Sequence, residues 1–180
     1  MKSIEIKGKR NIDKINNIKT PKRKECLNWI LPDEFMTNKK QIEIINNLYL
    51  ENAFEHDAFI KKELNKKITG YKNQDIKNNI YDIKKLISLE ETIEKLMMSK
   101  IKCFYCKENC QLLYKTIFEK KQWTLDRINN NNGHTSDNVV ISCLECNIKR
   151  GNMDNERFKK GKEIRICLLY TSPSPRDKRQ

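Results

Sequence analysis

Residues 103–106 read CFYC and residues 143–147 read CLECN, so the chain carries two pairs of cysteines that are each separated by two residues. Such a pair can offer both sulfur atoms to one metal ion from a single tight turn, and zinc binds four thiolates in tetrahedral geometry. The spacing therefore predicts one structural zinc ion, bound by Cys103, Cys106, Cys143 and Cys146. Cys110 is an alternative ligand, but its use would break the repeated spacing.

The segment between the two cysteine pairs has the pattern of a β-hairpin. Residues 123–128 read WTLDRI, the polar run NNNNGHTS follows at 129–136, and residues 137–142 read DNVVIS. Apolar and β-branched residues on both sides of a polar, glycine-containing run are typical of two antiparallel strands. The Asn132-Gly133 step favours a tight turn between them. A short helix is expected after the second cysteine pair, with Gly151 at its end.

These residues resemble the zinc-stapled branch of the HNH endonucleases, which are also called ββα-metal or His-Me finger enzymes. The similarity covers roughly residues 101–160 and rests on LDRI at 125–128, GHT at 133–135, DNV at 137–139 and CLECNIK at 143–149. The preceding region, with TGYK at 69–72 and QDIK at 74–77, is similar to uncharacterised HNH proteins of large eukaryotic DNA viruses. The resemblance implies an α+β chain, in which a helical N-terminal region precedes a zinc-stapled ββα-metal module.

The resemblance also implies roles for three residues of this module. Asp126 would be the first ligand of a catalytic divalent metal, Asn138 would fix the loop between the strands, and Asn147 would complete the metal site. Carboxylate and amide oxygens suit Mg²⁺ or Mn²⁺, which leaves zinc to the thiolates. Asp126 and Asn147 also have structural alternatives, because an aspartate beside a turn can cap it and an asparagine after the cysteine pair can begin the next helix.

Arg127 stands where the family usually has its general-base histidine. Arginine stays protonated at any working pH, so Arg127 would contact the phosphate instead of accepting a proton. Regular strand alternation would turn it away from Asp126. His134 in the loop is the candidate substitute base, and an ordinary loop histidine or a phosphate contact are its alternatives. A metal-bound hydroxide without a protein base is the remaining route.

The charge of the chain favours a polyanionic partner. The formal net charge is +13 and the isoelectric point is about 9.4, as is common in proteins that bind nucleic acid. DNA is therefore the expected partner, although the many lysine, isoleucine and asparagine residues of an AT-rich genome account for part of the excess. Lys149 and Arg150 are candidates for DNA phosphate contacts, or for solvated surface residues.

The composition also bears on the compartment. No apolar run approaches the roughly 18–20 residues that cross a bilayer, and the N-terminus lacks the apolar core of a secretory signal. We therefore expect a soluble, intracellular protein of the cytoplasm or nucleus of a host cell. Seven cysteines in that compartment are expected to be metal ligands and free thiols rather than disulfides.

Four segments are expected along the chain. Residues 1–36 form a basic arm that either follows nucleic acid or is solvated, residues 37–100 form a helical region, and residues 101–166 form the HNH-like zinc module. Residues 167–180 resemble the translation of a sequencing adapter, with a genuine disordered tail as the alternative. On the first reading the biological chain ends near Ile166.

Within the helical region, apolar spacing predicts one helix from Thr37 and a helical pattern from Phe54 to Gly70. Ser88 and Glu91 have the spacing of a capping box, which predicts the start of a further helix.

Together these patterns predict a divalent-metal-dependent DNA endonuclease that hydrolyses phosphodiester bonds. A catalytically inactive zinc module that binds DNA or protein is the alternative, because the usual base is missing. A purely structural zinc ribbon is a third interpretation, and it predicts neither cleavage nor salt-sensitive DNA binding.

Overall fold

The structure is a computed structural model that describes residues 12, 16 and 31–164. Most of the expected basic arm, the expected tail, Cys26 and Cys167 lie outside these residues. In chain order the elements are η1 Asp33–Met36, α2 Asn38–Tyr49, α3 Asp57–Lys77, α4 Leu89–Met98, β1 Trp123–Arg127, η2 Ser136–Asn138, β2 Val139–Cys143, α5 Leu144–Arg150 and α6 Asn155–Glu163. Within the described part, this mixture of helices and one antiparallel sheet is an α+β fold, as predicted.

The first predicted helix is present as α2. Thr37 precedes it, and the Thr37 hydroxyl accepts a hydrogen bond from the backbone N–H of Lys40. Ile44, Ile45 and Leu48 are buried on one face, as the amphipathic spacing requires. Among the residues that the structure describes, no helix combines the length and apolar character needed to cross a membrane.

Helix α3 is longer than its sequence pattern predicts. The pattern ends at Gly70, whereas the helix continues to Lys77. A Cβ atom at Gly70 would meet nothing within 4 Å, so this glycine faces open space and only weakens the helix locally. The buried face continues beyond it to Asp75, and contacts of that aspartate stabilise the last turns.

The capping box predicted at Ser88 is confirmed at the start of α4. The Ser88 hydroxyl accepts from the backbone N–H of Glu91 at 3.1 Å, and the Glu91 carboxylate accepts from the N–H of Ser88 at 2.8 Å. Two backbone N–H groups that the helix leaves without partners are thereby satisfied. Ile93 and Leu96 then point into the core.

The predicted hairpin is also present. β1 and β2 pair antiparallel, with Trp123 opposite Cys143 and Arg127 opposite Val139. The connection is longer than the tight Asn132-Gly133 turn that we predicted, because it spans residues 128–138 and contains η2. Gly133 serves a different purpose there, since a Cβ atom would lie only 2.8 Å from the Ile80 carbonyl oxygen. It permits close approach of the loop to the chain after α3.

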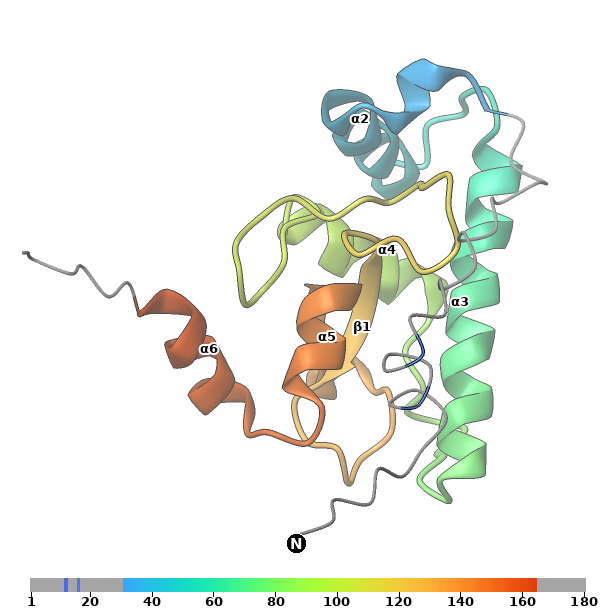
Figure 1. The fold of residues 1–180 in the computed structure, drawn as a ribbon. Helices are drawn as coiled ribbons and strands as arrows, with labels where there is room; N and C mark the ends of the chain where they lie inside the picture. Colours follow the sequence, from blue (N-terminus) through green and yellow to red (C-terminus); the bar gives the residue numbers. More distant parts are fainter. Residues whose placement is uncertain (1–11, 13–15, 17–30, 165–180) are drawn as a thin grey trace, which may run out of the picture.

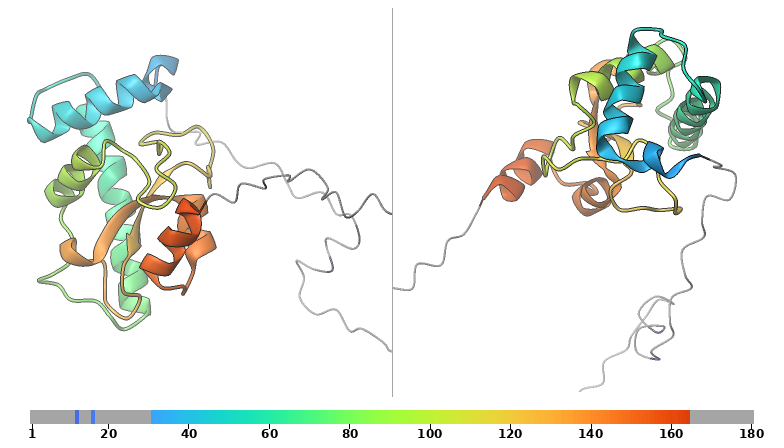
Figure 2. Two further views of the ribbon diagram at one scale, coloured as in Figure 1. Left: turned by 90° about the vertical axis from the view of Figure 1, so that its left-hand side faces the viewer. Right: turned by 90° about the horizontal axis from the view of Figure 1, so that it is seen from above.

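Three helices surround the hairpin. In Figures 1 and 2, α4 lies on one face of the hairpin, α5 lies on the opposite face, and the long helix α3 runs along its side. One continuous core joins them and contains residues from both sides of position 100, including Ile44, Leu96, Trp123 and Leu125. The hairpin is therefore held by the helical region as well as by its own cysteines.

Candidate functional site

The four predicted zinc ligands lie together. The Sγ atoms of Cys103, Cys106, Cys143 and Cys146 are all within 4.8 Å of one another, and three of the four residues are buried. Tetrahedral zinc with bonds of about 2.3 Å places its sulfur ligands about 3.8 Å apart, so a small contraction completes the site. The cluster can therefore hold a metal such as zinc.

Backbone hydrogen bonds connect the two halves of this cluster to the hairpin. The N–H of Phe104 donates to the carbonyl of Ile141 at 2.8 Å, which ties the first cysteine pair to β2. Cys143 ends β2 and precedes α5, and its sulfur accepts from the N–H of Cys146 at 3.4 Å. Cys110 is buried beside Cys103, and hydrogen bonds from Cys110 and Cys143 lower the pKa of the Cys103 thiol.

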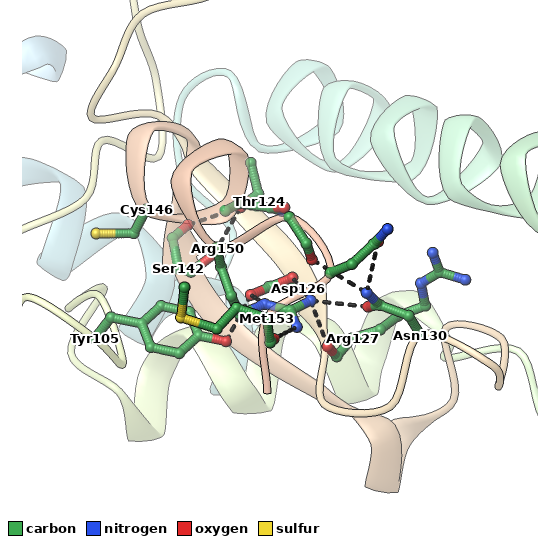
Figure 3. Close-up of polar contacts among 12 residues, drawn as sticks. Tyr105, Thr124, Asp126, Arg127, Asn130, Ser142, Cys146, Arg150 and Met153 are labelled. Carbon is green, nitrogen blue, oxygen red and sulfur yellow. Dashed lines mark hydrogen bonds and ion pairs between the residues drawn. The ribbon is translucent and has the colours of Figure 1, made fainter. Parts of the chain in front are cut away.

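Asp126, the predicted first ligand of the catalytic metal, lies in a buried ion pair. Arg150 donates from Nε to Oδ2 and from Nη2 to Oδ1, both at 2.8 Å, and the Tyr105 hydroxyl donates to Oδ2 at 2.6 Å (Figure 3). Both side chains of the ion pair are only 3% exposed. Asp126 therefore does not simply cap a turn, which was its structural alternative.

Arg150 is buried, whereas its neighbour Lys149 is exposed on the surface. Besides Asp126, its guanidinium donates to the carbonyls of Arg127 and Met153 and to the side-chain oxygen of Asn130 (Figure 3). Burial opposes its charge, but the hydrogen bond and the charge of Asp126 outweigh burial and raise its pKa. A solvated Arg150 is therefore wrong, and a phosphate contact would require these bonds to open. Lys149 is exposed and pairs with Glu145 at 2.8 Å.

Asn138 occupies the position expected of a loop-fixing residue. Its side-chain oxygen accepts from the N–H of Asn129, and its amide donates to the carbonyls of Asn129 and Gly133. Asn138 is 7% exposed, so these bonds are shielded from water. The loop carrying His134 is thus closed on itself by one side chain.

His134 is held by a residue that the sequence had not singled out. Its ring Nδ1 lies 2.7 Å from Asp75 Oδ1, and its backbone N–H donates to Asp75 Oδ2 at 2.7 Å. The ring lies against Tyr71, with centroids 4.6 Å apart. Burial lowers the pKa of His134 despite the opposing charge of Asp75, which favours the neutral imidazole. Burial also raises the pKa of Tyr71 to about 12.

Asn147 lies on α5 but does not begin it, because Cys143 takes that position. The Asn147 amide donates to the Thr124 hydroxyl at 3.1 Å. Its side-chain oxygen has no hydrogen bond among the described residues. The alternative in which Asn147 begins the helix is therefore wrong. The side-chain oxygen of Asn147 can still accept a hydrogen bond or bind a ligand.

Five of the predicted site residues line one cavity of about 240 Å³ between α3, β1, the hairpin loop and α5, whereas Asn138 is not among its lining residues. Its lining includes the predicted residues Asp126, Arg127, His134, Asn147 and Arg150. Tyr71 and Gln74 of α3, Asn130 and Asn152 complete much of the wall. Arg127, the last residue of β1, lines the same cavity as Asp126, although strand alternation would turn the two side chains apart.

Asp75, Tyr71 and Tyr105 were missed, although a sequence signal existed for the first. Ile60, Leu64, Ile68 and Asp75 lie on the buried face of α3, so Asp75 is an acidic residue on an otherwise apolar stripe. A charge at such a position requires a buried partner. Tyr105 lies between the first two cysteines, and no local pattern indicates its contact with Asp126.

The oxygen atoms predicted to bind Mg²⁺ or Mn²⁺ line the same cavity, but their arrangement does not form a free cation site. Both oxygens of Asp126 accept hydrogen bonds from Arg150, whose positive charge takes the place that a cation would need. A divalent ion would therefore have to displace the guanidinium. At the four cysteines, by contrast, no positively charged side chain of a described residue would have to be displaced by a metal ion.

The chain was compared with models of known protein families, with curated proteins and with solved structures, and none of these comparisons finds a match.

Proposed function

We propose that this protein is a DNA endonuclease of the HNH type, which hydrolyses phosphodiester bonds in the cavity beside its zinc-stapled hairpin. The observation that carries the proposal is the convergence of Asp126, His134 and Asn147, from a strand, a loop and a helix, on that one cavity. The predicted loop-fixing role of Asn138 supports it further. The net charge of +13 favours DNA as the substrate.

His134 is the general base in this proposal. Hydrolysis requires removal of a proton from water, stabilisation of charge on the phosphate and protonation of the departing sugar oxygen. A neutral imidazole can accept the proton from water, and Nδ1 is already engaged by Asp75, so Nε2 is the available nitrogen. Arg127 lines the same cavity and supplies positive charge for the phosphate.

Mg²⁺ or Mn²⁺ is proposed as the catalytic cofactor on the resemblance alone. When bound, such an ion would neutralise charge on the scissile phosphate. Asp126 and Asn147 would hold it through their side-chain oxygens once Arg150 had released Asp126. Zinc, by contrast, is proposed only as a structural ion at the four cysteines.

The test is cleavage of supercoiled plasmid by the full chain at matched zinc content, with Mg²⁺, Mn²⁺ or chelator. Wild type is expected to nick or linearise the plasmid, and His134→Asn should slow it by about 10²–10⁴-fold, the usual contribution of a general base. His56→Asn is the matched control, because His56 is the only other histidine and lies outside the cavity. Absence of cutting by folded wild type, across metals and pH, would refute the proposal.

A non-catalytic DNA-binding module is the second candidate, and one observation favours it. Asp126 is neutralised by Arg150 instead of being free for a metal, as expected of a module whose metal site has become structural. This candidate predicts salt-sensitive DNA binding by the zinc-loaded protein without cleavage. Fluorescence anisotropy with labelled duplex DNA, over a range of salt concentrations, separates it from a purely structural zinc hairpin.

A further inference from the structure

Asp75 and His134 form a buried pair that joins two distant parts of the chain. The Asp75 side chain is 2% exposed and the His134 side chain 3% exposed, and the two residues are 59 positions apart in the sequence. Asp75 uses one oxygen for the ring Nδ1 and the other for the backbone N–H of the same histidine. A contact through both atoms fixes the ring and the loop together.

The geometry also determines which ring nitrogen carries the proton. A carboxylate only accepts hydrogen bonds, so Nδ1 of the neutral ring must be the protonated nitrogen. Nε2 is then unprotonated and is the only ring atom able to accept a proton. It makes no hydrogen bond to any described residue, and the ring lines the cavity.

Several features of the surroundings keep the pair in place. The backbone carbonyl of His134 accepts from the N–H of Ile87 at 2.9 Å, and the Tyr71 ring covers the imidazole. A Cβ atom on Gly133 would lie 3.0 Å from Asp75 Oδ2, so the preceding residue must be small for the carboxylate to approach. The other charged groups near the ring are Arg127, whose Nη1 lies 3.9 Å from Asp75 Oδ1, and Asp126.

We propose that Asp75 is a positioning residue for catalysis, which holds His134 in the tautomer and orientation that present Nε2 as the base. This inference rests on the proposed nuclease function and extends its machinery to α3. Nε2 takes a proton from water, the water oxygen bonds to phosphorus, and the bond from phosphorus to the departing sugar oxygen breaks. That oxygen takes up a proton from solvent, so the reaction needs no further reactant.

Asp75→Asn is the informative variant because it keeps the shape of the side chain and reverses one hydrogen bond. With its oxygen still accepting from the His134 backbone, the new amide would donate to Nδ1 and force the proton onto Nε2. The base would then be blocked while the loop stayed attached. The single-turnover cleavage rate is expected to fall by about 10²–10⁴-fold with little change in DNA affinity. Asp57→Asn, at the half-buried start of the same helix and outside the cavity, is the control.

Two readouts distinguish positioning from a merely structural contact. Nitrogen-15 NMR of the imidazoles should show the Nδ1-protonated tautomer for His134 in wild type and the Nε2-protonated form in Asp75→Asn, with His56→Asn used for assignment. The pH–rate profile should also change. Because Asp75 raises the pKa of His134 against the effect of burial, its loss should move the acid limb to lower pH.

The outcomes separate this inference from the proposed function. If wild type does not cut DNA, the nuclease and its base fail together. If wild type cuts and His134→Asn does not, but Asp75→Asn keeps the wild-type rate and acid limb, only the role of Asp75 is overturned. An Nε2-protonated neutral His134 in wild type would also overturn it, and that measurement does not require Asp75→Asn to fold.

Discussion

At the scale of single residues, the buried pair of Asp126 and Arg150 bears most directly on both function and stability. A carboxylate and a guanidinium that are each 3% exposed have lost nearly all contact with water, and their mutual hydrogen bonds, with those from Tyr105 and to Asn130, offset that loss. Removing one partner leaves the other charge buried and uncompensated. The energetic cost is therefore much larger than for an exposed pair.

Arg150→Met is accordingly expected to lower the free energy of unfolding by about 3–5 kcal/mol. Adding Asp126→Asn should restore part of the loss, since the remaining side chain is uncharged and can still accept from Tyr105. Lys149→Met, which breaks the neighbouring exposed pair with Glu145, should cost no more than about 1 kcal/mol. Urea unfolding of the zinc-loaded proteins measures all three. Equal losses in the two single variants would contradict the buried pair.

At the scale of elements, the contact between the hairpin loop and the end of α3 depends on a glycine. A Cβ atom at Gly133 would lie 2.8 Å from the Ile80 carbonyl, which is closer than side-chain carbons approach backbone oxygens. Gly133→Ala is expected to push the loop away from Ile80 and Asp75, destabilise the protein by about 1–3 kcal/mol and weaken the contact of Asp75 with His134.

Gly70→Ala, within α3, is expected to raise the stability of the protein instead of lowering it. Nothing lies within 4 Å of its Cβ position, so alanine should stabilise α3 by about 0.5–1 kcal/mol through its better helix propensity. Thermal unfolding of both variants provides the comparison, and a stabilising Gly133→Ala would show that the loop does not press against Ile80.

Some of the helices and strands could be predicted from the sequence and others could not. The hairpin strands, the short helix that ends before Gly151 and the capping box at Ser88 follow local patterns, and all are present, although that helix begins within the second cysteine pair. The extension of α3 beyond Gly70 was not predicted, because glycine often follows the last residue of a helix. The sequence pattern alone does not distinguish such a glycine from a solvent-facing one inside a helix. The contacts of Asp75 with His134 and of Tyr105 with Asp126 depend on which surfaces meet in three dimensions. The local spacing of apolar residues does not predict such long-range contacts.

At the scale of the whole molecule, the cysteine cluster connects the parts that shape the cavity. The first pair brings Tyr105 to Asp126, and the second pair lies where β2 passes into the helix that carries Asn147 and Arg150. Structural zinc sites bind with about 10–16 kcal/mol at neutral pH, whereas domains are stable by only about 5–15 kcal/mol. Loss of the metal is therefore expected to unfold the hairpin region rather than merely loosen it.

Chelation of the zinc-loaded protein should consequently shift its tryptophan fluorescence to longer wavelength, because Trp123 lies opposite Cys143 and is 1% exposed. Added Zn²⁺ should restore the original spectrum. Cys103→Ser should fail to retain one zinc per chain, whereas Cys110→Ser should retain it, since Cys110 lies beside the cluster but outside the group of four. Metal content by atomic spectroscopy decides the comparison. Equal zinc loss in both cysteine variants would replace the paired arrangement with one in which Cys110 is a ligand.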